Sequence, residues 1–127
     1  MMITLTYGGV LGIVYIYLSW NVAMGRKRAG AGLGHGGDEA LQRDIRIHGN
    51  FAEYVPFALL LIGMLEAAHG PALLIRWLGG MLVVARLLHI WGLRQSAGTS
   101  FGRVSGAILT WLTILVASGM GLYIGLA

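Results

Sequence analysis

Residues 43–62, RDIRIHGNFAEYVPFALLLI, hold the feature that decides the fold of this chain. Two arginines, an asparagine and a glutamate lead directly into a run that is apolar enough to enter a lipid bilayer. A charged side chain inside a membrane costs several kcal/mol unless protein, water or a ligand solvates it. The stretch therefore predicts a membrane helix whose polar side chains have a partner.

The composition of the whole chain is typical of a membrane protein. Of its 127 residues, 57% are hydrophobic and 11% are charged, and the mean hydropathy of +0.74 is too high for a soluble domain. There is no cysteine, so the sequence offers neither a disulfide framework nor a thiolate of its own. The net charge of +4 comes from basic residues at the ends of apolar runs, so we expect no nucleic-acid partner.

Four apolar runs follow one another, each near the roughly 20 residues that cross a hydrocarbon core. Only His69, Gly70 and Pro71 separate the second and third runs, which predicts an antiparallel helical hairpin. The second helix is expected to begin before its apolar run, with Asp38 or Asp44 as its N-cap. We predict an all-α, polytopic membrane four-helix bundle in one domain, residues 1–127, with helices at about 3–24, 40–68, 72–94 and 103–126 and a glycine-rich loop at about 25–39.

Basic residues in the connections predict the orientation, because Lys and Arg favour cytoplasmic loops. The second connection has none, whereas the first and third carry Arg26, Lys27, Arg28, Arg43, Arg46, Arg94 and Arg103. We therefore expect the first and third loops in the cytoplasm and both termini outside. Near the outer hairpin, Glu66 and Arg76 are expected to reach the interface or to pair with each other.

The polar residues of the opening stretch recur with helical spacing. Separations of three, four, three and four positions place them within an arc of roughly 80° at about 100° per residue. This polar stripe consists of Arg43, Arg46, Asn50, Glu53 and Phe57. Because lipid cannot solvate it, we expect the polar stripe to face the bundle interior or a wet cavity.

The third run carries Arg86, which lies about eight residues before the loop and hence roughly 12 Å deep at 1.5 Å per residue. His89 follows one turn later on the same face. Two interpretations stay open. Arg86 and Glu53 form a buried ion pair that only fixes helix register, or the surplus of arginines at 46, 86 and 103 forms a cationic cavity for an anionic ligand.

Two other kinds of site are disfavoured. The glycine-rich segment AGAGLGHGGDEALQRD (29–44) lacks the Gly-Lys-Ser/Thr ending of a phosphate-binding loop, and no strand precedes it. A metal site is not expected, because the histidines lie on separate segments and on opposite predicted membrane faces: His35, His48, His69 and His89.

Two segments resemble motifs of the MAPEG family, the membrane-associated proteins in eicosanoid and glutathione metabolism. QRDIRIHGNFAEYVPF (42–57) is similar to the second-helix motif of that family, and ARLLHIWG (85–92) is similar to its third-helix Arg-x-x-Tyr/His motif. The length, the four spans, the long first loop and the short outer hairpin also match. The resemblance covers essentially the whole chain and is nearest to the bacterial inner-membrane branch.

The resemblance implies a homotrimer in the lipid bilayer that binds glutathione between subunits, near the cytoplasmic side. It implies that Glu53 takes the γ-glutamyl ammonium, that arginines take the carboxylates, and that Arg86 and Arg103 are the catalytic residues, Arg103 as the one that activates the thiol. The implied glutathione-binding residues are Arg43, Arg46, His48, Asn50, Glu53, Tyr54, Arg86 and His89.

The function that the resemblance implies is a membrane-bound glutathione transferase in the bacterial inner membrane, with both termini periplasmic. Glutathione is its co-substrate, its second substrate is a hydrophobic electrophile or lipid, and peroxidase activity toward lipid hydroperoxides is an extension. Two alternatives stay open: a non-catalytic glutathione or lipid binding protein, and a small four-helix exporter. The exporter is disfavoured because the first helix lacks an acidic residue.

Overall fold

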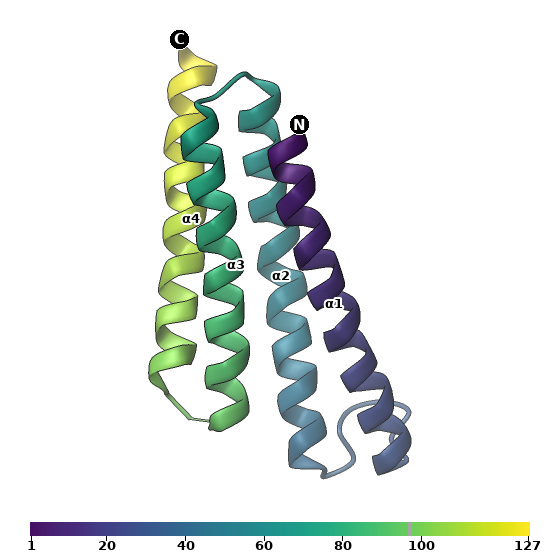
Figure 1. Cartoon of the computed structure of the whole chain (residues 1–127). Helices are drawn as coiled ribbons and strands as arrows, with labels where there is room; N and C mark the ends of the chain where they lie inside the picture. The colour runs from purple at the N-terminus through teal and green to yellow at the C-terminus, as the bar shows by residue number, and fades with distance from the viewer. Residues whose placement is uncertain (97) are drawn as a thin grey trace.

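A computed structural model describes residues 1–96 and 98–127 of the chain and confirms the all-α prediction (Figure 1). Each helix is long and apolar enough to cross a membrane. The connections α1–α2 and α3–α4 lie at one end of the bundle, here the loop end; the α2–α3 turn and both termini lie at the other, here the hairpin end (Figure 1). The helices are α1 (Met2–Ala29), α2 (Glu39–Ala67), α3 (Ala72–Gln95) and α4 (Phe101–Leu126).

The four helices do not surround a common axis equally. The α2 and α3 helices pack against each other and against both outer helices, whereas α1 and α4 share no contact within the described part of the chain. Figure 1 shows α1 and α4 on opposite flanks of the central pair. A site between α4 and α2 or α3 is therefore separate from α1.

The helix ends follow from local capping chemistry. The α1 helix continues past Met24, its predicted end, through three basic residues, whose positive charges are stabilised at the negative end of the helix dipole. It stops at Gly30, whose backbone lies in the left-handed region with φ of 64°. Of the two N-cap candidates for α2, Asp38 is the one used, since its carboxylate accepts from the Leu41 N–H at 2.8 Å. The Ser100 hydroxyl accepts from the Arg103 N–H and begins α4 at residue 101.

The core is formed by the apolar side of α2 together with apolar residues of the other helices. Ile47, Phe51 and Val55 are each at most 3% exposed. Their burial turns much of the polar stripe outward: the side chains of Arg46 and Glu53 are each 58% exposed, and Phe57 is also exposed. Within one chain, Arg46, Glu53 and Phe57 of the polar stripe therefore do not face the bundle interior, because the neighbouring apolar side of α2 fills it.

Glycines bring the backbones of α3 and α4 together near the loop end. A Cβ added to Gly106 would lie 2.6 Å from the Ala85 carbonyl oxygen and 2.7 Å from the His89 Cβ. A Cβ on Gly102 would lie 2.8 Å from the Leu88 carbonyl oxygen, and one on Gly92 would overlap the α4 backbone. Only glycine, which has a hydrogen in place of a side chain, allows α3 and α4 to approach this closely at these positions.

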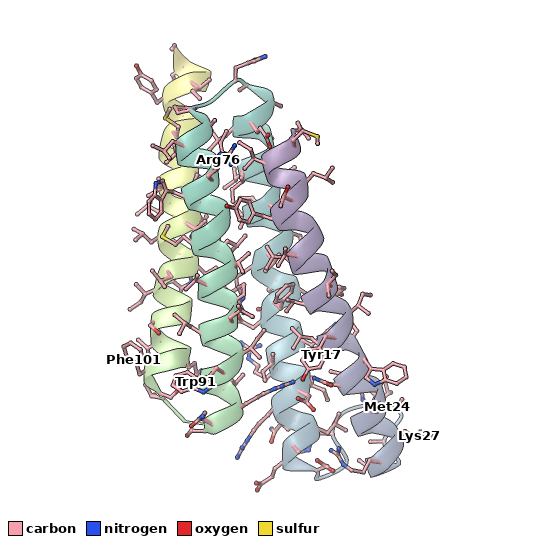
Figure 2. All side chains as sticks on the ribbon, in the orientation of Figure 1. Tyr17, Met24, Lys27, Arg76, Trp91 and Phe101 are labelled. Atoms are coloured by element: carbon pink, nitrogen blue, oxygen red, sulfur yellow. The ribbon has the colours of Figure 1, made fainter. Side chains whose placement is uncertain are left out.

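At the hairpin end, Glu66 bonds to the first turn of α1. Its carboxylate accepts from the backbone N–H groups of Ile3 at 2.9 Å and Thr4 at 2.8 Å. Pairing between Glu66 and Arg76 was one of two expected outcomes, and the structure shows that the carboxylate caps α1 instead. Arg76 is exposed at the same end of the bundle (Figure 2).

At the loop end, Arg94 connects three helices. Its guanidinium donates to the Tyr17 hydroxyl at 3.0 Å, lies over the Tyr17 ring at 5.3 Å, and approaches Asp44 at 3.9 Å. Figure 2 shows Trp91 and Phe101 at this end of α3 and α4. Arg94 thus has a structural role that holds α3 against α1 and α2.

Candidate functional site

The centre of the candidate site is Arg86, which is 1% exposed. Its Nη2 donates to the Asn50 Oδ1 at 2.6 Å and to the His89 Nδ1 at 3.3 Å, and its Nη1 donates to the Thr110 Oγ1 at 3.3 Å. The guanidinium carbon also lies 5.7 Å from the centre of the Phe51 ring. One buried cation therefore joins α2, α3 and α4 through neutral side chains.

The predicted alternative of a buried Arg86–Glu53 pair is wrong. Glu53 forms its ion pair with Arg46 at 3.7 Å, and both of these side chains lie at the surface of the chain. The reason is helix rotation: Asn50, one turn before Glu53, is the stripe residue that turns toward α3, so its amide reaches Arg86 first.

Three arginines gather near His89. The side chains of Arg46, Arg86 and Arg103 all lie within electrostatic range of its imidazole. They come from α2, α3 and α4, and Glu53 is the acid that pairs with one of them. Six of the predicted site residues thus lie in one region with more cations than anions: Arg46, Asn50, Glu53, Arg86, His89 and Arg103.

Tyr54 lies beside this group on an apolar groove between α2 and α4. Its hydroxyl accepts from the Trp111 Nε1–H at 3.3 Å. The groove has a volume of about 700 Å³ and is lined by Glu53, Tyr54, Phe57, Ile108, Trp111, Leu112, Ile114, Leu115 and Ser118. Its size and apolar lining suit a hydrophobic molecule, and Glu53 is the one charged residue in this lining.

Two predicted ligand residues lie outside this group. His48 faces α1, where its ring stacks on Tyr15 at 5.0 Å and its Nε2 lies 3.0 Å from the Ser19 hydroxyl. Since that hydroxyl already donates to the Tyr15 carbonyl, it accepts from His48. Arg43 lies one turn nearer the loop end than Arg46 and forms no ion pair with any residue that the structure describes.

The arrangement is suited to binding an anion. Arginine is charged at every accessible pH and donates in a planar fork that matches carboxylates. The same cations would lower the pKa of a thiol held near them. No group of three or more His, Asp or Glu residues capable of holding a metal ion occurs in the two described ranges.

Sequence reasoning missed Thr110 and the glycines that place α4. Thr110 donates to the Gly106 carbonyl at 2.8 Å, which leaves its oxygen free to accept from Arg86. The available signal was the spacing of Gly102, Gly106 and Thr110, a small residue at every fourth position, which marks close contact between membrane helices.

Comparison with known proteins gives matches over nearly the whole chain. Residues 4–123 match the MAPEG family. The chain is 30% identical over 115 residues to inner membrane protein YecN of Escherichia coli strain K12, which covers 91% of this chain and 86% of that protein. Inner membrane protein YecN of Escherichia coli O6:H1 strain CFT073 matches with the same identity and coverage. No solved structure matches.

Proposed function

Because the chain belongs to the MAPEG family, we propose that it is a membrane-bound glutathione transferase that conjugates glutathione to hydrophobic electrophiles. The observation that carries this proposal is the buried Arg86, bonded to Asn50 and His89, together with the Arg46–Glu53 pair on α2, since Glu53 also lines the apolar groove between α2 and α4. Glutathione is an anion with one ammonium group, so a site rich in arginine with a single carboxylate complements it.

The chemistry assigned to these residues is thiolate formation and attack. A free thiol has a pKa near 8.5, and only the thiolate is a strong nucleophile. In the proposed complex, Glu53 accepts from the γ-glutamyl ammonium, Arg46 binds a carboxylate, and Arg103 stabilises the thiolate. The sulfur then forms a bond to the electrophilic carbon, and the leaving group departs with the electron pair. Reduction of lipid hydroperoxides by the same thiolate is a proposed extension.

We further propose that the protein is a homotrimer whose site is completed at subunit contacts. The Arg46–Glu53 pair is more than half exposed on a helix that spans the membrane, and lipid offers an ion pair no hydrogen bonds. A second copy that covers α2 would enclose this pair and the bound tripeptide. We place the loop end in the cytoplasm and both termini in the periplasm of a bacterial inner membrane, the membrane named for the YecN relatives.

The test is glutathione binding to the purified protein in mild detergent, with the ultraviolet absorbance of the thiolate read in the same samples. The wild type is expected to bind glutathione and to show thiolate at neutral pH. Glu53→Gln should weaken binding by roughly tenfold, as expected for the loss of one charged hydrogen bond. Arg103→Ala should keep affinity within a few-fold, lose the thiolate signal at neutral pH, and recover it as the pH approaches that of a free thiol. Arg76→Gln, at the hairpin end, is the control.

Four results would contradict parts of this proposal. Absence of glutathione binding to the wild type would reject the transferase, and binding without thiolate would identify a non-catalytic binding protein. Superimposable pH profiles for the wild type and Arg103→Ala would remove Arg103 from thiol activation. A monomeric mass in detergent with binding intact would reject the shared site.

A further inference from the structure

We infer that Arg86 acts without touching glutathione, as a positioning residue that holds the Asn50 amide and the His89 Nε2–H as hydrogen-bond donors for the ligand. The inference rests on the proposed function for the identity of the ligand. It differs from the role that the family resemblance implies, in which Arg86 is a glutathione ligand. Its basis is the hydrogen-bond chemistry of the buried guanidinium.

The orientation of the Asn50 amide follows from its hydrogen-bond partner. A guanidinium has only donors, so the Asn50 atom that lies 2.6 Å from the Arg86 Nη2 must be the carbonyl oxygen. The opposite amide orientation would place two donors against each other. Arg86 therefore directs both N–H bonds of the Asn50 amide away from itself. Asn50 is only half-buried, so these donors are accessible to a ligand.

The tautomer of His89 also follows from the fact that Arg86 can only donate. Its Nδ1 lies 3.3 Å from the Arg86 Nη2, and a nitrogen that accepts from arginine cannot carry a proton. The imidazole is therefore neutral, with its proton on Nε2. His89 is thus a donor and not a general base at Nδ1.

The position of the Arg86 side chain is fixed by its own contacts and by its burial. Its Nη1 donates to Thr110, whose own proton is committed to the Gly106 carbonyl, and its plane lies over Phe51. The side chain is 1% exposed, and its Nε is buried without a hydrogen-bond partner in the described residues. Direct contact with a tripeptide would require the three helices to part. The Asn50 amide, on a half-buried residue, can instead meet an anionic group at the edge of the cluster, and His89, which is 4% exposed, is the more deeply placed of the two donors.

The first experiment measures the tautomer in the protein without ligand. Nitrogen-15 NMR of labelled protein in lipid nanodiscs distinguishes protonated from unprotonated ring nitrogens, and His89→Gln assigns the signal. We expect the Nε2–H form of His89 in the wild type and in Arg76→Met, a matched loss of an arginine from the same helix. Arg86→Met should give a mixture of tautomers. A wild-type His89 with a proton on Nδ1 would overturn the inference, even if Arg86→Met does not fold.

The second experiment measures glutathione affinity in a double-mutant cycle. Arg86→Met should weaken binding by roughly tenfold in the wild type, but by less than about twofold when Asn50→Ala and His89→Phe are already present. Equal losses in both backgrounds would show that Arg86 touches glutathione and would overturn the inference. If the wild type binds no glutathione, the proposed function fails, and the tautomer measurement alone decides whether Arg86 holds the imidazole.

Discussion

Replacement of Gly106 by alanine tests whether close contact between α3 and α4 builds the site. The new Cβ would lie 2.6 Å from both the Ala85 carbonyl oxygen and the His89 backbone nitrogen. Ordinary contact begins near 3.4 Å, so the helices must move apart by about 0.8 Å. The atoms in the way are backbone and Cβ atoms, which cannot rotate aside, so the separation must be taken up by the helices themselves.

The magnitude combines two opposed effects. Overpacking of a close contact costs about 1–3 kcal/mol, whereas exchange of glycine for alanine inside a helix gains up to about 1 kcal/mol. Gly106→Ala is therefore expected to lower the free energy of unfolding by about 0–2 kcal/mol. Gly119→Ala, on the same helix, meets nothing within 4 Å and should only gain. The two variants should thus differ by about 1–3 kcal/mol.

The assay is reversible unfolding in mixed micelles, followed by helical circular dichroism, with the two variants measured beside the wild type. The same two variants should also differ in glutathione affinity. Gly106→Ala should bind more weakly, because Gly106 contacts His89 directly and Gly119 is remote from it. Equal stabilities for Gly106→Ala and Gly119→Ala would refute the reasoning. They would show that the α3–α4 contact adapts without cost and that the glycine spacing does not set the position of Arg103.

Two further predictions concern contacts outside the site. Glu66→Gln removes the carboxylate that accepts from the N–H groups of Ile3 and Thr4, so their amide hydrogen exchange should accelerate while exchange in the middle of α1 stays unchanged. The Leu41 N–H and the Arg28 guanidinium hold the pKa of Asp38 below its usual value, so the stability that Asp38 contributes is present above about pH 3.9 and is lost as the pH falls through the lowered value. Acid titration of the Leu41 amide exchange rate should show this loss in the wild type and not in Asp38→Ala.

The number of helices and most of their ends could be predicted because they depend on local sequence. Apolar runs set the spans, and Asp38 fits the rules for an N-cap. The extension of α1 to Ala29 was missed because hydropathy ends at Met24, whereas helical hydrogen bonding continues into the basic segment. Backbone bonding does not require an apolar side chain.

The sequence grouped the candidate residues but did not identify their contacts. Helical spacing gathered Arg46, Asn50 and Glu53, and depth singled out Arg86, because both follow from one helix at a time. The partner of Arg86 depends on how α2 and α4 are rotated against α3. Asn50 lies one helical turn before Glu53 on α2. Charge alone favours Glu53 as the partner of Arg86, but the rotation of α2 places Asn50 there. The glycine contacts that bring Thr110 close decide this geometry.

Arg86 and Arg46 differ in exposure as well as in distance from the loop end. Arg86, the farther of the two from the loop end, is enclosed by protein and has three side-chain partners, which replace the water that would solvate an exposed cation. Arg46, nearer the loop, keeps more than half of its side chain exposed. An anion that enters from the loop end would therefore meet Arg46 before it reaches the donors of Asn50 and His89, and it would stop there, because the guanidinium of Arg86 lies enclosed behind them. In the proposed transferase, this order would hold the thiol of glutathione beside the apolar groove, where a hydrophobic electrophile can arrive from the lipid.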